Sequence, residues 1–192
     1  MGTRNLTIVK LDGKVRVAQY GQWDGYPTGQ GETVAEFVNS HKDLDYFKDK
    51  VRATKQITEK TKRAQWVKCG ADPKENYVST DVSHKHGVRY PENSRDSGAK
   101  ILEIIQLKPD GLEIELEKLG RSIGKSMGEC DAEFAYEINL DKETVTVWAY
   151  GTKYGIYSFK EFAPWSMEAL EEEMNANDHQ VKTPKTKIKG KE

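Results

Sequence analysis

The sequence predicts an α+β fold, in which a single domain carries an antiparallel sheet with helices packed on one of its faces. Two strand-rich blocks, residues 6–20 and 131–160, lie on either side of a long stretch with apolar residues at helical spacing. Separate blocks of strands and helices are typical of α+β domains. We expect the domain to span residues 1–174, and the polar, lysine-rich residues 175–192 to form a disordered tail.

Composition and charge limit the classes of protein to which the chain can belong. It has 192 residues, of which 36% are hydrophobic and 32% are charged, and its formal net charge is −1. This balance argues against wholesale binding to nucleic acid or to anionic membranes. No apolar run approaches the ~18–20 residues that span a bilayer, and the first residues lack the apolar stretch of a signal peptide. The lack of such a run predicts that the protein does not bind a membrane. Two cysteines do not make a disulfide framework, so we expect a cytoplasmic protein.

The first strand-rich block predicts a β-hairpin. Residues 6–11 and 14–20 are β-rich runs, and Asp12-Gly13 between them readily supplies the positive φ of a tight turn. The later block, residues 131–160, alternates between apolar and polar side chains and is interrupted by short turns. We interpret it as a meander that joins the hairpin in one antiparallel sheet.

Helices are expected where apolar residues repeat every three or four positions. A first helix should begin near Glu32, because Val34, Phe37 and Val38 then share one face. Asn93-Ser94 contains two good N-cap residues, so a further helix should open there. The other predicted helices cover residues 44–51, 57–67 and 167–174. The intervening segments with weaker patterns are predicted as a short strand and a loop, over residues 77–82 and 84–93 respectively.

A glycine-rich loop over residues 21–31 is the first candidate site. Gly29 and Gly31 precede the predicted helix, and free backbone N–H groups at a helix start favour a phosphate or carboxylate. Nearby aromatic rings could stack on a base. The alternative is a structural connection, in which the aromatic side chains plug the core and Asp24 caps a turn. The loop lacks the Gly-Lys-Ser/Thr ending of a P-loop, so it does not predict an ordinary ATPase.

A second helix start offers similar chemistry together with a positive charge. Arg95 lies in Ser94-Arg95-Asp96-Ser97-Gly98, which is either a plain capped helix or, beside the first loop, part of a basic pocket. The two segments together predict a site for a nucleotide-like anion. Its expected ligand-binding residues are Arg4, Trp23, Asp24, Tyr26, Gly29, Gly31 and Arg95.

Residues 48–68 form a basic stretch with one tryptophan among the lysines and arginines. Such a charge run is usually a solvated helix face. The other interpretation is a surface that binds nucleic acid or an acidic host protein. The residues expected to contact such a partner are Lys60, Lys62, Arg63 and Trp66.

No metal and no other cofactor is expected. The four residues that could bind zinc have spacings that fit no compact motif; they are Cys69, His84, His86 and Cys130. A nucleophile at Thr3 would require removal of both Met1 and Gly2. Because clustered Ser/His/Asp groups and paired carboxylates are also missing from the sequence, it favours a protein that is not an enzyme.

Three stretches of the chain carry a family resemblance. They are Thr3-Arg4-Asn5 with Trp23-Asp24-Gly25-Tyr26-Pro27, residues 94–105, and residues 134–141. The chain resembles a family of small uncharacterised proteins found in phages and mobile elements, whose members start with a Thr-Arg strand and carry a Trp-Asp-Gly-Tyr-Pro loop ahead of a helix. The resemblance covers residues 1–38, 93–106 and 131–162. It implies a phage-like context in the host cytoplasm, where small proteins often inhibit or evade host defence.

These observations lead to one expected function and two alternatives. We expect a phage-like protein that evades host defence by binding and sequestering a nucleotide-type signalling molecule, without catalysis. The first alternative is an inhibitor that binds a host defence protein through residues 48–68. The second is a hydrolase with an N-terminal nucleophile. A homo-oligomer is compatible with each, because the edge of the predicted sheet could pair with a second copy.

Overall fold

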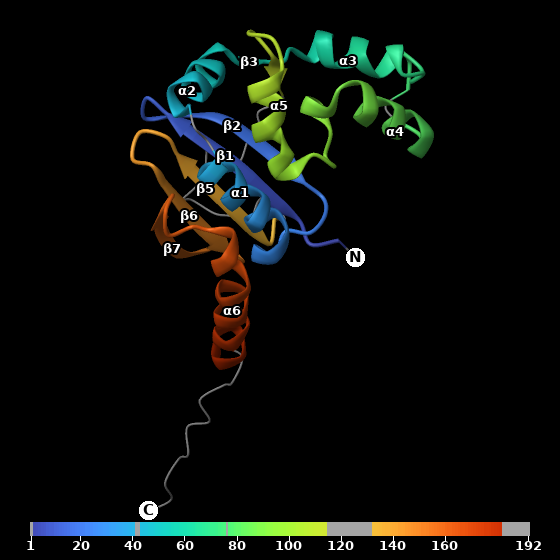
Figure 1. Cartoon of the computed structure of the whole chain (residues 1–192). Helices are drawn as coiled ribbons and strands as arrows, with labels where there is room; N and C mark the ends of the chain where they lie inside the picture. The colour runs from blue at the N-terminus through green and yellow to red at the C-terminus, as the bar shows by residue number, and fades with distance from the viewer. Residues whose placement is uncertain (1, 41–42, 76, 115–131, 182–192) are drawn as a thin grey trace, which may run out of the picture.

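A five-stranded sheet forms the centre of the computed structural model, which describes residues 2–40, 43–75, 77–114 and 132–181. Its strands lie in the order β2-β1-β5-β6-β7. Their bounds are Asn5–Leu11 (β1), Lys14–Gly21 (β2), Phe134–Asn139 (β5), Thr144–Ala149 (β6) and Thr152–Ser158 (β7). A separate parallel pair is formed by β3 (Lys55–Gln56) and β4 (Glu113–Ile114). The sheet and its helices confirm the predicted α+β class (Figure 1).

The N-terminal hairpin forms as predicted, and its turn is tied to a second turn. Asp12 and Gly13 have φ angles of 54° and 68°, the left-handed region that a two-residue hairpin turn requires. Their backbone N–H groups donate to the two carboxylate oxygens of Asp141, each over 3.0 Å. Asp141 follows β5, so this contact holds the β1–β2 turn against the β5–β6 turn.

One junction in the sheet differs from the predicted antiparallel arrangement. β1 and β5 run parallel, with Asn5 opposite Phe134 and Lys10 opposite Asn139. The other three pairs in this sheet are antiparallel. A parallel pair needs a long crossover connection, and residues 22–133 provide one between the hairpin and the meander. The hairpin and the meander are therefore two antiparallel units joined along one parallel seam.

The main core lies between one face of the sheet and the helices α1 (Glu32–Ser40), α2 (Leu44–Ala53), α5 (Ile101–Leu107) and α6 (Met167–Val181) (Figure 1). Alternate strand residues point toward these helices because successive side chains of a strand face opposite ways. They include Val9, Val17, Tyr136, Ile138, Val145 and Val147. The opposite face carries a smaller cluster of Leu6, Ile8, Ala132 and Ala135.

Two helices form an arm beyond the β2 edge of the sheet, α3 (Glu59–Lys68) and α4 (Thr80–Arg89) (Figure 1). The predicted strand over residues 77–82 and the predicted loop over 84–93 are wrong, because α4 takes up half of the first segment and most of the second. Ser79 begins this helix as its N-cap, accepting from the backbone N–H of Val82. His86 is the buried residue of α4, so the helix carries no apolar stripe by which its period could be recognised.

The segment before α5 also departs from the prediction. Two 3-10 turns, Pro91–Asn93 and Gly98–Lys100, precede α5, and the α-helix begins at Ile101 rather than near Ser94. Gly98 has a φ of 47°, a left-handed conformation that interrupts a right-handed helix. At the other end of the chain, α6 continues to Val181, beyond the domain boundary expected at residue 174. The rest of the predicted tail, residues 182–192, lies outside the described residues.

Candidate ligand-binding pocket

A pocket of about 160 Å³ lies where the α3–α4 arm meets the sheet edge. Strand β2, helices α3 and α4, and the turn after Pro91 each contribute to its wall. The lining residues are Gln19, Tyr20, Lys62, Trp66, Ser83, His86, Asn93, Ser94 and Arg95. Three of them, Lys62, Trp66 and Arg95, were predicted as site residues but in two separate sets.

An aromatic pair forms one wall of the pocket. The rings of Trp66 and His86 stack with their centroids 3.8 Å apart and an interplanar angle of 11°. His86 is only 2% exposed, and the ring of Tyr90 lies 5.4 Å from it. One face of the indole is thus covered by the imidazole, and Trp66 itself stays half-buried at the pocket. Stacked aromatic walls of this kind suit a flat ring.

A buried amide network holds the aromatic pair in place. Gln65 Oε1 lies 3.3 Å from His86 Nε2 and 3.5 Å from Asn93 Nδ2. Asn93 Nδ2 also donates to the carbonyl of Glu113 over 3.1 Å. Because Glu113 is in β4, the network links α3, α4 and the small β3–β4 sheet behind the pocket.

A second amide anchors the pocket to the edge strand. Gln19 Nε2 donates to the carbonyl of Tyr20 over 3.0 Å and to the carbonyl of Ser94 over 2.7 Å. The backbone N–H of Gln22 donates to the carbonyl of Arg95 over 2.9 Å. The turn that carries Arg95 is therefore fastened to β2 by both side-chain and backbone hydrogen bonds.

The charged groups of the pocket are all basic. Lys62 is half-buried on α3 and Arg95 is exposed on the turn opposite. None of the described residues that line the pocket is acidic. Two cations at a partly enclosed mouth raise the local potential and favour an anion. Arginine in particular suits phosphate, since its planar fork can donate two parallel hydrogen bonds.

In the glycine-rich loop, backbone N–H groups donate hydrogen bonds to carbonyls of the same loop. Those of Gly29 and Gly31 donate to the carbonyl of Tyr26, over 3.0 and 3.2 Å, and that of Gln30 donates to the carbonyl of Asp24 over 2.8 Å. Thr28 donates through both its N–H and its hydroxyl to Glu171 of α6, over 3.1 and 2.5 Å. The N–H groups that the sequence suggested for a bound anion are therefore used within the loop, and the neighbouring N–H of Thr28 serves a carboxylate of the chain itself.

A buried tyrosine supports this loop from below. The hydroxyl of Tyr136 donates to the carbonyl of Gly25 over 2.8 Å. Burial, and to a smaller extent the charge of Glu171, raises the pKa of Tyr136, so its hydroxyl stays protonated and remains a donor. Gly31 packs directly on this ring, since a Cβ at that position would lie 3.0 Å from the tyrosine oxygen.

The other residues predicted for the loop site also make contacts within the chain. The backbone N–H of Arg4 donates to Glu133 over 2.6 Å, and Arg4 Nε lies 3.5 Å from the same carboxylate oxygen. Trp23 is 50% exposed, and its indole N–H donates to Asp96 over 3.2 Å. Tyr26 packs against the ring of Phe134. The loop and the Arg95 turn do lie side by side, but these contacts join them instead of leaving a gap.

The basic stretch does not form one continuous surface. Arg63 donates to the carbonyls of Asp72, Pro73 and Glu75, at distances of 3.2, 2.8 and 2.6 Å. Lys62 and Trp66 belong to the pocket, and Lys60 is exposed. Earlier cations of the stretch are paired with carboxylates: Lys48 with Asp45, Lys50 with Asp110, and Arg52 with Asp49 and Asp12.

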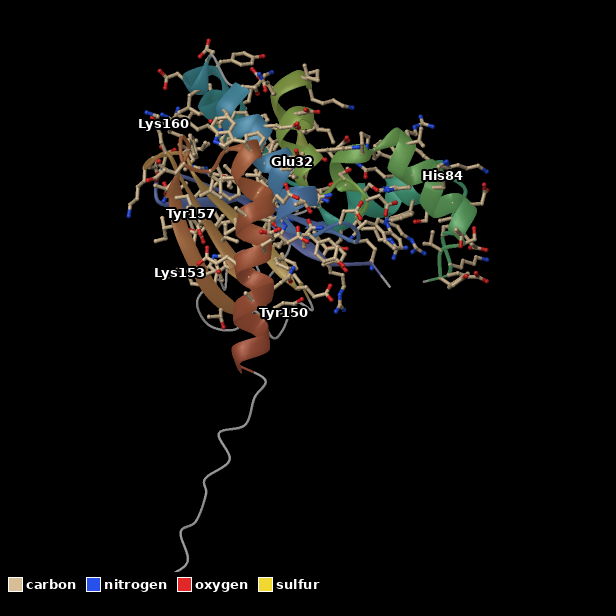
Figure 2. The ribbon with its side chains drawn as sticks, turned by 60° about the horizontal axis from the view of Figure 1, so that its bottom comes forward. Glu32, His84, Tyr150, Lys153, Tyr157 and Lys160 are labelled. Carbon is tan, nitrogen blue, oxygen red and sulfur yellow. The ribbon has the colours of Figure 1, made fainter. Side chains whose placement is uncertain are left out.

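The residues considered for zinc are dispersed. Cys69 is buried at the end of α3, His86 is stacked on Trp66, and Cys130 lies outside the described residues. Figure 2 shows His84 on the α3–α4 arm, across the molecule from Tyr150 and Tyr157 beside α6. In the part of the chain that the structure describes, no three His, Cys, Asp or Glu side chains gather closely enough to hold a metal ion. No helix in that part is both long and apolar enough to cross a membrane.

Sequence reasoning missed the polar residues that build the pocket, above all Gln19, Gln65 and Asn93. The available signal was weak. Gln19 shares its face of β2 with Val17, and a polar residue on a core-facing side is unusual unless it is hydrogen-bonded. Gln65 and Asn93 carry no pattern that distinguishes them from surface residues.

Comparison with known proteins adds no relative. No model of a known protein family matches the chain, and neither the curated proteins nor the solved structures contain a significant match.

Proposed function

We propose that the protein binds a nucleotide-type, phosphate-bearing molecule in the pocket between β2, α3 and α4, and sequesters it without catalysis. The observation that carries this proposal is the convergence of an aromatic wall, two cations and buried polar groups on one pocket. A base would stack on Trp66 within the pocket. The phosphate would then lie at the mouth, near Lys62 and Arg95.

The size of the pocket supports a particular placement of such a ligand. Drug-sized ligands usually occupy pockets of roughly 300–1,000 Å³. The present volume of about 160 Å³ is smaller and suits a single flat ring system. The sugar and phosphate would therefore extend over the rim, where Arg95 is exposed. The proposed ligand site thus keeps Arg95 from the predicted set and moves away from the glycine-rich loop.

The biological role proposed for sequestration rests on the resemblance to proteins of phages and mobile elements. A phage-like protein that holds a nucleotide signal would deprive a host defence system of that signal. The rigid attachment of the Arg95 turn to β2 supports binding, because a preorganised site loses less entropy when it captures a ligand.

A thermal-shift screen followed by calorimetry tests the proposal. The panel contains mononucleotides, cyclic dinucleotides, cyclic oligonucleotides and NAD-derived molecules. A ligand at ~100 times its dissociation constant should stabilise the protein by ~2.7 kcal/mol, which raises Tm by roughly 5–10 °C at this chain length. Arg95→Ala and Lys62→Ala should each weaken binding by about tenfold, as expected for a lost charge-assisted hydrogen bond of about 1.5 kcal/mol.

Lys60→Ala is the matched control, because Lys60 is an exposed lysine on the same helix and does not line the pocket. It should leave the affinity unchanged. A panel with no Tm shift, or a ligand whose affinity ignores both Arg95 and Lys62, would overturn the proposal. A pull-down with charge-reversed Lys60, Lys62 and Arg63 would then test the protein-binding alternative.

A further inference from the structure

Gln19 presents a hydrogen-bond acceptor whose direction is fixed by the fold. The side chain is 5% exposed and lines the pocket. Its amide nitrogen donates to two backbone carbonyls, those of Tyr20 and Ser94. Only the NH₂ end of an amide can serve two carbonyls, so the amide cannot be flipped without placing oxygen against oxygen. The carbonyl oxygen Oε1 is therefore the atom left for a ligand.

Among the described residues, none serves this acceptor. No described residue donates a hydrogen bond to Gln19 Oε1, whereas the amide nitrogen of the same side chain has two partners. Oε1 is not one of the fully buried side-chain atoms that lack a partner, so it remains accessible from the pocket that Gln19 lines. A carbonyl oxygen at this position repels phosphate oxygens but attracts an N–H group. Gln19 and the two cations thus favour opposite ends of a nucleotide.

We propose, on the basis of the function proposed above, that Gln19 Oε1 selects ligands whose base carries an amine donor. A base stacked on Trp66 would direct its exocyclic amine to Gln19, and its phosphate would point outward to Lys62 and Arg95. The ligand class is a nucleotide with one inserted amine-bearing base, such as an adenine or a cytosine. Gln19 is a specificity-determining residue in this arrangement, since it distinguishes bases by their hydrogen-bonding edge and not by their size.

Paired ligands test this inference on the unmodified protein. Adenosine 5′-monophosphate is compared by calorimetry with purine riboside 5′-monophosphate, which has hydrogen in place of the amine. Cytidine 5′-monophosphate is compared with its 4-deamino analogue in the same way. In whichever pair binds, the amine-bearing member should bind about 5- to 100-fold more tightly, because its analogue would cover the Gln19 acceptor without giving it a donor.

A variant locates the effect at Gln19. Gln19→Met has a similar length but no acceptor, and should bind both members of a pair with equal affinity. Gln56→Met, at an exposed glutamine on β3, should keep the full discrimination. Because Gln19→Met also unpairs two carbonyls, its fold is checked by circular dichroism. The comparison in the unmodified protein stands even if this variant does not fold.

The outcomes separate the two proposals. If both members of a pair bind the unmodified protein equally, the role of Gln19 is overturned and the nucleotide site remains. Discrimination that survives in a folded Gln19→Met protein also overturns it. If no member of either pair binds while another panel ligand does, base selection by Gln19 is overturned without affecting the site. If nothing in the whole panel binds, both proposals fail.

Discussion

Trp66 and His86 lie face to face, with ring centroids 3.8 Å apart, and this contact joins the two helices of the arm. Trp66 lies on α3 and His86 on α4. The imidazole is buried while the indole is half-buried, so the pair connects the interior of the arm to the pocket. The same residues therefore stabilise the arm and form the wall on which a base would stack.

Replacing Trp66 should affect both stability and ligand binding. Trp66→Ala removes the stack on His86 and the wall of the pocket, and should lower the free energy of unfolding by roughly 1–3 kcal/mol. Denaturant unfolding followed by circular dichroism measures this loss. Trp165→Ala is the control, because Trp165 is 81% exposed and should change stability far less. Equal effects of the two substitutions would contradict the structural role assigned to Trp66.

Arg63 should act as a clamp within the arm. Its guanidinium donates to three carbonyls of the turn over residues 72–75. Arg63→Ala should increase amide hydrogen exchange in that turn and at the start of α4, since the loss of these bonds frees the connection. Arg63→Lys should restore part of the protection, because all three carbonyls accept from the single nitrogen Nη2 and an ammonium nitrogen can also donate to several acceptors. Unchanged hydrogen exchange in both variants would show that the turn is stable without the hydrogen bonds from Arg63.

Two loop glycines should differ in their sensitivity to alanine. A Cβ at Gly29 would lie 2.3 Å from the backbone oxygen of Asp24, whereas one at Gly31 would lie 3.0 Å from the Tyr136 hydroxyl oxygen. Backbone yields less easily than a side chain. Gly29→Ala should therefore lower stability by about 1–3 kcal/mol, and Gly31→Ala by less. Thermal unfolding of both variants tests the order, and the reverse order would contradict it.

The contact between Asp141 and the β1–β2 turn should make the stability of the fold depend on pH in the acid range. Hydrogen bonds from the N–H groups of Gly13 and Asp12 lower the pKa of Asp141 below its ordinary value near 3.8. A carboxyl with a lowered folded-state pKa stabilises the fold above its unfolded pKa, and this contribution is lost as the pH falls through the folded pKa. The Tm difference between the unmodified protein and Asp141→Asn should be largest near neutral pH and should shrink below about pH 4. A difference that stays constant from pH 7 to pH 2 would contradict the role of the charge.

The contact between Thr28 and Glu171 should stabilise the position of α6. Glu171 accepts from both the N–H and the hydroxyl of Thr28. Glu171→Gln should lower stability by about 1 kcal/mol, because it weakens two charge-assisted hydrogen bonds at an exposed position. Glu172→Gln is the control at the neighbouring, exposed carboxylate. In a Thr28→Val background, which removes the hydroxyl but keeps the backbone N–H, the Glu171 substitution should lose part of its effect, and an undiminished effect would place the role of Glu171 elsewhere.

The parts of the fold that were predicted correctly depend on local chemistry. Asp12-Gly13 dictates its hairpin turn, and Val34 with Phe37 identifies α1 by spacing alone. The parallel seam between β1 and β5 was not predicted, because strand direction depends on the route of the chain between them. The helix over Thr80–Arg89 was missed for another reason: it packs through His86 and lacks an apolar stripe.

The pocket could be predicted only as fragments. Arg95, Lys62 and Trp66 were each identified as candidates from charge or aromatic character. To predict that these residues line one pocket, one must know that α3 and the Arg95 turn both lie beside β2. No periodicity in the sequence indicates that tertiary arrangement. The role proposed for Gln19 could not be inferred at all, since the orientation of its amide becomes evident only once both carbonyl partners of its nitrogen are placed.

The parallel seam also has a consequence for how the chain folds. The β1–β2 hairpin and the β5–β7 meander each close through short turns, so both can form early and locally. Asn5 and Phe134, however, must find each other across most of the domain before the seam can close. Such distant contacts are slow to form, because the loop-closure entropy is lost before any pairing energy is gained. We therefore expect the two halves to appear first during refolding, and the middle of the sheet to be completed last.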